Sequence, residues 1–408
     1  MRAIFINHCH PDCPHVCGTR AREFARALAR QGHRIVLLTE TLRREDPPPK
    51  PGALHAALAT HDWSSPFYLA VPPHRSPVLA RLRAGVLPRA ISAAIVAYQY
   101  LWRGGMFTDW RDASRPYWTI LAQEFKPEVT WGIFGNTDAW AIAQGIARLA
   151  GCPWVRDVKD QWTAFIPASL RWPVAGRYDD AAAATSLSDV NAADAAGWFP
   201  GGSATVYSGV SPEIIASSAP VAPTSFIVTL VGAAYEAGAL ATLVEGVARF
   251  LAGGRTPVEL HYAGTDTTAV EAALTRLQGK CAIHVHGQLA FGAYAALVAR
   301  SHLNVYVRTA KTGWWHHKIV ELLAVRRPIL CVPGEIDEAR RLAQSVHGQL
   351  LSAADPAAVA AALETVWQKK NAPPSGSADA LQTLTWDATA ARLAGVLASV
   401  TPAGRAQS

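Results

Sequence analysis

Cysteine and histidine side chains gather in one short segment near the start of the chain, "NHCHPDCPHVCGTR" (residues 7–20). Thiolates and imidazoles are common zinc ligands, so the segment first suggests a metal site. Zinc ribbons and fingers pair their cysteines about two to four residues apart and add a second ligand pair further on. Here Cys9, Cys13 and Cys17 have only nearby histidines as partners, so the pattern matches no standard zinc site and we predict none.

The position of this segment indicates a different role. It lies between an apolar run (residues 3–7) and a helix-period pattern (residues 19–33), and a second apolar run follows (residues 34–40). This β-α-β order predicts a parallel sheet, in which such a loop opens at the carboxyl ends of the strands, where ligands bind. Gly18 would let the backbone approach a ligand closely. The segment is either a substrate-facing loop or a loop that is simply rich in cysteine and histidine.

A second group of polar side chains follows a buried strand, in "RDVKDQW" (residues 156–162). It offers Arg156, Asp157 and Asp160, and charges at such a place are costly unless they are paired or used. The segment "GIFGN" (residues 132–136) ends another strand with Asn136 and would frame the same edge. Both a role in a cleft and a structural ion-pair network are consistent with this pattern.

Composition and length set the class of protein. With 408 residues, 50% hydrophobic and 17% charged, the chain is long enough for two globular domains with large cores. Six cysteines, three of them in one segment, and the absence of a cleavable signal after Met1 predict the reducing cytoplasm. The net charge of +7 favours an anionic partner, but signatures of nucleic-acid binding are missing. A nucleotide, a phosphate group or an anionic membrane surface remain as alternatives.

The second half of the chain repeats the organisation of the first. After a Pro-containing segment (residues 216–225), apolar runs alternate with helical patterns, which indicates a second parallel sheet. The predicted fold class is α/β, with two Rossmann-like domains, residues 1–215 and residues 224–380. The strands expected in the second domain are residues 226–232, 258–264, 282–287, 303–307 and 327–334.

Several segments, in this order, resemble the GT-B-fold glycosyltransferases, family 4 type. They are "GTRAREFARALARQGHRIVLLT", "WVRDVKDQW", "VYSGVSPEI", "VTLVGAAYEAGALATLVEGV" and "HKIVELLAVRRPILCV". The resemblance implies two Rossmann-like domains facing each other across a cleft, and a retaining enzyme that transfers a sugar from a nucleotide-sugar donor. It also implies that residues 381–400, with "LTWDATAARLAGVL", form a closing helix that crosses back to the first domain.

The resemblance places the donor site in the second domain. A departing diphosphate needs a positive charge, and Lys318, at the start of the helical pattern "KIVELLAV", would supply it without a metal. Glu321, one turn further, would accept hydrogen bonds from the ribose hydroxyls. The alternative is an ordinary ion pair on a solvated helix face. His317 and the two strand-end glycines, Gly232 and Gly264, complete the predicted donor-binding set.

Two departures from the family pattern bear on this site. Many members carry Glu-x7-Glu, but Gly313 stands eight positions before Glu321. The usual Arg and Lys after the first strand of the second domain are missing from "GAAYEAG" (residues 232–238). Arg308 or Lys311 would supply the lost charge. Otherwise the chain would bind a ligand without transferring a sugar.

The first domain would hold the acceptor. We expect Asp157 and His10 to act in catalysis, while His15 orients the acceptor or takes its proton, although a loop histidine is commonly just solvated. For the two aspartates of "RDVKDQW", the family suggests acceptor-side or architectural roles. The remaining predicted acceptor-side residues are Gly18, Arg20, Asn136, Arg156 and Asp160.

An arginine-flanked apolar segment (residues 75–105) raises the question of membrane contact. Its apolar core (residues 90–101) is too short for the roughly 20 residues of a spanning helix. It would either lie on a membrane surface, as suits a lipid-linked acceptor, or form two helices packed on the first domain.

These observations predict a glycosyltransferase that moves a sugar from a nucleotide diphosphate sugar to a glycan or lipid-linked acceptor, in the synthesis of polysaccharide or cell-surface glycan. We expect no cofactor, no metal requirement and no nucleic-acid partner, and a location in the cytoplasm or at the inner face of the membrane. Two alternatives remain: a GT-B-shaped protein that binds without catalysis, and a nucleotide-sugar 2-epimerase.

Overall fold

The chain forms two compact units. The computed structural model describes residues 1–13, 15–43, 46–74, 76–216, 224–234, 236–309, 314–373 and 375–401. The first unit comprises Met1–Ser208 and the chain from Trp386 onward, and the second comprises Gly209–Thr385. The second unit begins before residue 224 because the backbone of Val210 pairs with that of Thr385.

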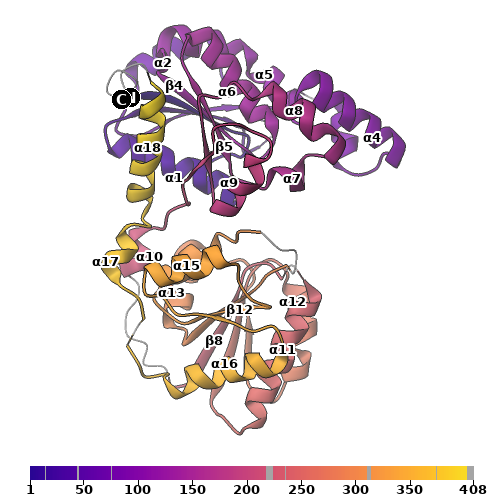
Figure 1. Cartoon of the computed structure of the whole chain (residues 1–408), viewed down its shortest axis with the longest axis vertical. Helices are drawn as coiled ribbons and strands as arrows, with labels where there is room; N and C mark the ends of the chain where they lie inside the picture. Colours follow the sequence, from indigo (N-terminus) through magenta and orange to yellow (C-terminus); the bar gives the residue numbers. More distant parts are fainter. Residues whose placement is uncertain are drawn as a thin grey trace. The chain divides into compact units, whose positions relative to one another are not determined.

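A parallel sheet of seven strands, in the order β3-β2-β1-β4-β5-β6-β7, forms the centre of the first unit (Figure 1). This order places the carboxyl ends of β1, β4 and β5 side by side, so the loops that follow them meet at one edge of the sheet. The strands are β1 (Arg2–Asn7), β2 (Arg34–Glu40), β3 (Phe67–Val71), β4 (Val129–Ile133), β5 (Trp154–Val158), β6 (Ala183–Ser186) and β7 (Ala204–Thr205).

Helices cover both faces of this sheet, because its strands are apolar on both sides. Ile4 and Ile6 of β1 join one core with α2, α5 and α6, while Ala3 and Phe5 join a second core with α1 and α18. The helical elements are α1 (Val16–Arg30), α2 (Pro51–Thr60), α3 (Pro77–Arg83), α4 (Arg89–Tyr98), η1 (Gln99–Arg103), α5 (Thr108–Ile120), η2 (Leu121–Phe125), α6 (Thr137–Ala150), α7 (Trp162–Phe165), η3 (Ala168–Leu170), α8 (Arg171–Arg177), α9 (Asp189–Ala196) and α18 (Trp386–Val400).

The last helix, α18, packs on the first unit although it follows the second unit in the sequence. The ring of Trp386 meets that of Phe24 on α1 edge to face, with centroids 5.3 Å apart. Arg30, at the end of α1, pairs with Asp387 at 2.6 Å. Leu393 and Leu397 are fully buried in the same core, so α18 is part of the first unit.

A parallel sheet of six strands, in the order β10-β9-β8-β11-β12-β13, forms the second unit. The strands are β8 (Phe226–Val231), β9 (Val258–Ala263), β10 (Ala282–Val285), β11 (Leu303–Val307), β12 (Ile329–Val332) and β13 (Leu350–Ser352). Helices α11 and α16 cover one face, and α13 and α15 lie on the other (Figure 1). The helical elements are α10 (Pro212–Ala216), α11 (Ala237–Ala252), α12 (Thr267–Leu274), η4 (Thr275–Leu277), α13 (Phe291–Arg300), α14 (Lys318–Ala324), α15 (Asp337–Ser345), α16 (Pro356–Gln368) and α17 (Ala378–Gln382).

Helix α1 begins three residues before the predicted pattern and also ends earlier. It begins at Val16 because the ring Nδ1 of His15 accepts a hydrogen bond from the amide of Cys17 and caps the helix. It ends at Arg30, before Gly32, whose φ of +84° breaks the helical backbone. The arginine-flanked segment forms α3, α4 and η1, and among the described residues no helix is long and apolar enough to cross a membrane.

Candidate functional site

The loops after β8 and β9 are joined at the carboxyl edge of the second sheet. The hydroxyl of Tyr262 donates to the carbonyl of Gly232 at 3.0 Å and accepts from the amide of Asp266 at 2.9 Å. The carboxylate of Asp266 accepts from the amide of Ala234 at 2.8 Å. A Cβ on Gly264 would overlap the carbonyl oxygen of Gly232, so the close packing of the two loops requires glycine there. These contacts fix the two loops against each other, and together the loops form one surface at the strand ends.

The ammonium of Lys318 lies directly against this loop surface, at Gly232. A Cβ on Gly232 would overlap Nζ and Cε of Lys318, which shows how closely the ammonium approaches this backbone, and the φ of +76° at Gly232 favours glycine. Burial lowers the pKa of Lys318 to about 8, and the negative charges of Glu321 and Asp266 only partly oppose this shift. At neutral pH the lysine, which is only partly exposed, therefore carries a charge that its burial disfavours, and a bound anion would stabilise that charge.

Glu321 lies in the first turn of α14 with Lys318. Burial raises the pKa of Glu321 to about 7, against the opposing charge of Lys318 and a hydrogen bond from the hydroxyl of Tyr294 on α13. The ring Nε2 of His317 lies 3.7 Å from a carboxylate oxygen of Glu321. Lys318 and Glu321 are both only partly exposed, and burial opposes the charge of each, which distinguishes them from an ion pair on a fully solvated helix face.

Arg308 brings a second cation to the carboxyl edge of the same sheet, just after β11. Its side chain is buried, and Nη1 donates to the carbonyl of Gly334 at 2.9 Å. Its Nε and Nη2 have no hydrogen-bond partner among the described residues. Buried guanidinium donors of this kind suit an anionic ligand. The other candidate for the lost charge, Lys311, lies outside the described residues, as does Gly313.

In the first unit, Asp157 and Arg20 form a buried ion pair rather than a ligand-contacting site. Both side chains are almost fully buried, and the carboxylate accepts from the guanidinium at 3.0 and 3.3 Å and from the hydroxyl of Thr185 at 2.7 Å. Arg20 also donates to Val206 and Ser208. A group without solvent access cannot touch a substrate in this arrangement. We therefore revise the predicted catalytic role of Asp157 and the acceptor-side role of Arg20 to fixing α1 against β5.

Two further acceptor-side expectations are revised in the same way. The buried guanidinium of Arg156 donates to the carbonyls of Tyr178 and Pro200 and lies over the ring of Phe199. Arg156 therefore links β5 to two segments that follow it in the sequence. Gly18 does permit a close approach, but the approaching backbone is that of the loop itself. A Cβ there would overlap the carbonyl oxygen of His10, so Gly18 shapes the loop after β1 rather than clearing room for a ligand.

The histidines of that loop have structural partners. The Nδ1 of His10 accepts from the amide of Asp12 at 3.1 Å, and His15 caps α1. Asn136 is the N-cap of α6, where its side-chain oxygen accepts from the amide of Asp138 at 2.8 Å. The structure thus explains each of these predicted acceptor-side residues by local folding, while His10 and His15 remain partly exposed and available to a ligand.

Cys17 and Lys159 link this loop to the end of β5. The ammonium of Lys159 lies 2.8 Å from the sulfur of Cys17 and pairs with Asp160, and both Cys17 and Lys159 are buried. Burial would raise the pKa of the Cys17 thiol, but the hydrogen bond to His15 and the charge of Lys159 together lower it. Asp160, predicted on the acceptor side, is thereby held near His15 at this edge of the sheet.

The fold can be compared with known proteins once this geometry is described. No protein-family model and no curated protein matches the chain. Solved structures do match over nearly the whole length. A glycosyltransferase from Rickettsia africae has a TM-score of 0.66 at 10% identity, with 98% of each chain covered. Acinetobacter baumannii MurG has a TM-score of 0.50 at 15% identity, covering 97% of this chain and 98% of that one.

A third similar structure is a UDP-GlcNAc 2-epimerase from Neisseria meningitidis bound to UDP-GlcNAc. Its TM-score is 0.51 at 9% identity, with 97% of this chain and 99% of that chain covered. The chain has a GT-B-type fold. At these identities the likeness establishes the GT-B fold alone, and the epimerase shows that this fold is shared by more than one class of sugar-nucleotide protein.

Within the GT-B fold, the residues predicted for the donor are brought together more closely than those predicted for the acceptor. Lys318, Glu321 and Gly232 form one cluster in the second unit, with His317 and Gly264 beside it. Sequence reasoning missed three residues. Tyr294 forms a hydrogen bond with Glu321, and Asp266 places a negative charge near Lys318. The third is Lys159, in the first unit. Lys159 stands between the two aspartates of "RDVKDQW" and could have been found, whereas nothing in the sequence around Tyr294 marks it.

Proposed function

We propose that the protein is a glycosyltransferase that uses a nucleoside diphosphate sugar, with the diphosphate bound at Lys318. The observation that carries this proposal is the position of the Lys318 ammonium over Gly232, at the carboxyl end of β8. Ligands of open α/β sheets bind at the carboxyl ends of strands, and a desolvated cation there stabilises the charge that develops on a departing diphosphate. Two donors of Arg308, Nε and Nη2, have no hydrogen-bond partner within the described part of the chain, which supports an anionic ligand at the same edge.

Glu321 is proposed to bind the ribose of the donor. A carboxylate can accept hydrogen bonds from two neighbouring hydroxyls, and the hydrogen bond from Tyr294 holds its orientation. Because Lys318 and Arg308 supply the positive charge, the proposed transfer needs no divalent metal. Retention of the anomeric configuration, implied by the resemblance to family 4, is part of the proposal.

The acceptor is proposed to be a glycan or a lipid-linked sugar bound by the first unit. His10, His15 and Asp160 are the predicted acceptor-side residues that remain partly exposed there. They lie on the loops after β1 and β5, and these strands end at the same edge of the sheet. An imidazole at this edge can orient a hydroxyl or take its proton near neutral pH. The buried side chains of Arg20, Asp157 and Arg156 would hold the elements that carry these loops in place.

Nucleoside diphosphates should stabilise the protein through Glu321 and Lys318. A ligand at a hundred times its dissociation constant adds about 2.7 kcal/mol to the free energy of unfolding, which a thermal-shift panel of diphosphates would detect.

Glu321→Gln should weaken binding of the free diphosphate by about ten- to a hundredfold at pH 8, where the wild-type carboxyl is ionised. Glu271→Gln, an exposed glutamate of α12, is the matched control. Equal affinity of Glu321→Gln and wild type would refute the ribose role.

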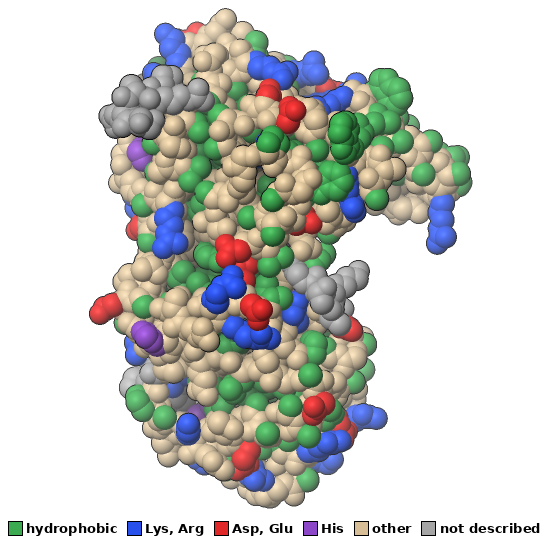
Figure 2. All heavy atoms as spheres, in the orientation of Figure 1, with side chains coloured by type: hydrophobic (Ala, Val, Ile, Leu, Met, Phe, Trp, Pro, Cys, Tyr) green, Lys and Arg blue, Asp and Glu red, His purple; other side chains and the backbone are tan. Residues whose placement is uncertain are grey.

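A projecting part of the first unit exposes apolar side chains beside arginines. Helix α4 has no fully buried side chain and projects from the unit, and hydrophobic side chains gather on this projection (Figure 2). Trp102, on η1, is 70% exposed and Trp172, on the neighbouring α8, is 81% exposed. Exposed tryptophans with nearby arginines are typical of surfaces that lie in the headgroup region of a membrane. We propose that this surface, which also includes Ile91 and Tyr98, contacts an anionic membrane.

Vesicle binding tests this surface. The wild-type protein should co-sediment with vesicles that contain anionic lipid, and Trp102→Glu should reduce the bound fraction at least about threefold, since it places a charge in an apolar contact. Phe291→Glu is the matched control, because Phe291 is an exposed aromatic residue of α13, in the second unit. If the wild type stays in the supernatant, or if both variants bind like the wild type, the membrane contact is wrong.

A further inference from the structure

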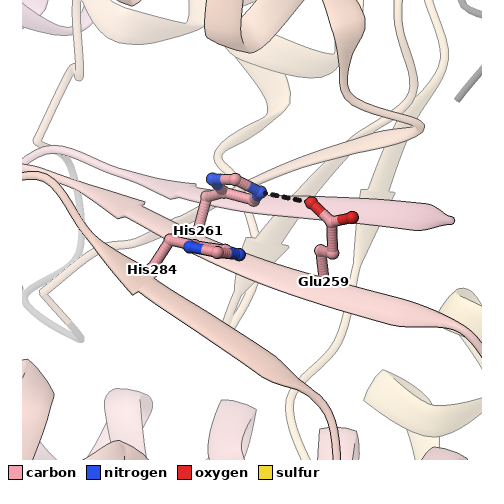
Figure 3. Close-up of side chains that lie close together, drawn as sticks. All are labelled: Glu259, His261 and His284. Carbon is pink, nitrogen blue, oxygen red and sulfur yellow. Dashed lines mark hydrogen bonds and ion pairs between the residues drawn. The ribbon is translucent and has the colours of Figure 1, made fainter.

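Two adjacent strands of the second unit carry metal-ligating side chains on the same face. Glu259 and His261 stand two positions apart on β9, so both side chains point to the same side of the sheet. His284, on the edge strand β10, is paired in register with His261. Figure 3 shows the three side chains converging from the two strands. None of the three belongs to the donor cluster around Lys318, which lies at the carboxyl end of β8.

The spacing of the three side chains suits a single metal ion. One ligand atom from each of Glu259, His261 and His284 lies within 4.8 Å of the others, and no other such group occurs among the described residues. The Nε2 of His261 is 3.1 Å from a carboxylate oxygen of Glu259. Ligands about 2.0–2.1 Å from a tetrahedral Zn²⁺ lie roughly 3.3 Å from each other, so this pair already has the required separation. The exposed ring of His284 offers the third ligand atom, within the same 4.8 Å.

Neighbouring groups hold two of these ligands in place. The Nδ1 of His261 lies 2.9 Å from Nε2 of His286, and the hydroxyl of Ser225 donates to the other carboxylate oxygen of Glu259. Metal-bound histidines commonly donate their second ring N–H to a neighbouring acceptor, which fixes the tautomer and the ring orientation. A metal on Nε2 of His261 would leave the proton on Nδ1, where His286 can accept it.

The kind of ligands narrows the class of ion. Two imidazoles with one carboxylate suit Zn²⁺, Co²⁺ or Ni²⁺, whereas Ca²⁺ and Mg²⁺ prefer oxygen ligands throughout. The positive charge of Arg300, on α13, acts on His261 and His286 and opposes a bound cation. A dissociation constant in the micromolar range is therefore expected rather than the much tighter binding of a structural zinc finger.

We propose that Glu259, His261 and His284 bind one divalent transition-metal ion, which clamps the edge strand β10 to β9. In the sheet, β10 is an edge strand that pairs with β9 alone. A metal ion bound by both strands would therefore stabilise the pairing of this edge strand. Water would complete the coordination. The site is independent of the proposed glycosyl transfer, and it differs from the cysteine-rich segment that the sequence first suggested.

Cobalt titration tests this site. Chelator-treated full-length protein is titrated with Co²⁺, and the visible absorption of the bound ion is recorded. One equivalent should bind with the spectrum of nitrogen and oxygen ligands, and His284→Ala should weaken binding at least about tenfold. His284 is exposed, so this variant should fold normally. His55→Ala is the matched control, since His55 pairs with Glu124 at 2.9 Å and belongs to no three-ligand group among the described residues.

Three outcomes would overturn the proposal. They are the absence of Co²⁺ binding up to about millimolar concentration, equal affinity of His284→Ala and wild type, and a thiolate-to-cobalt charge-transfer band. The last would show that a cysteine thiolate binds the ion in place of one of the three proposed ligands. A second readout is stability: Zn²⁺ should raise the melting temperature of the wild type and His55→Ala, but not that of His284→Ala.

Discussion

Replacing Lys318 by alanine is expected to lower kcat/KM for the sugar-nucleotide donor by about ten- to a thousandfold, the loss typical of removing one transition-state donor. The ammonium lies over Gly232, where a departing diphosphate would develop its charge. Removing the side chain leaves the buried Arg308, whose Nε and Nη2 have no hydrogen-bond partner among the described residues, as a second cation at this edge. The rate of diphosphate release from the donor, measured at several donor concentrations, gives kcat/KM.

A second lysine separates this effect from a general loss of charge. Lys280 is exposed and lies at the amino end of β10, the opposite end of the sheet from Gly232, so Lys280→Ala should keep full activity. Burial already disfavours the charge of Lys318, so its removal should not lower the melting temperature. Wild-type kcat/KM in a folded Lys318→Ala protein would remove Lys318 from the donor site.

Replacing Asp157 by alanine is expected to lower the free energy of unfolding by about 3–5 kcal/mol. The change would leave Nε and Nη2 of Arg20 in a fully buried position without the carboxylate that accepts from them. An unpaired buried charge is among the costliest defects that a single substitution can create. Denaturant unfolding followed by tryptophan fluorescence would measure the loss, because Trp131 and Trp140 pack close to this ion pair.

The partner substitution shows whether the cost comes from the unpaired charge. Arg20→Met combined with Asp157→Leu removes both charges and should be clearly more stable than Asp157→Ala alone, because buried ion pairs can be replaced by apolar side chains at little cost. If Asp157→Ala instead unfolds like the wild type but loses activity, Asp157 acts in catalysis after all, and its assignment as a structural residue is wrong.

The fold class could be predicted because the parallel strands are buried on both faces. Segments such as residues 3–6 and 329–332 are continuous apolar runs, and the helix-period patterns between such runs indicate the crossover helices. The short edge strands β7 and β13 were not predicted, since two or three residues carry too little pattern. The early start of α1 depends on a cap by His15, which is not among the preferred capping residues.

The roles of single charged residues were harder to predict than their location. Arg20 and Asp157 were each identified as notable, but they are 137 positions apart, and only the fold shows that they pair. Tyr294 contacts Glu321 from another helix, and no spacing in the sequence connects the two. The cluster of Glu259, His261 and His284 depends on the register between β9 and β10, which the sequence does not reveal.

The most direct test of the account is to follow the fate of a donor sugar by NMR. The protein is incubated with each of a panel of nucleoside diphosphate sugars, and the anomeric and C2 signals are recorded over time. A glycosyltransferase should release the diphosphate from one of these donors, slowly to water and faster with an acceptor, and Lys318→Ala should lose this release. Conversion to the C2 epimer with the diphosphate still attached, or no change in any donor, would contradict glycosyl transfer.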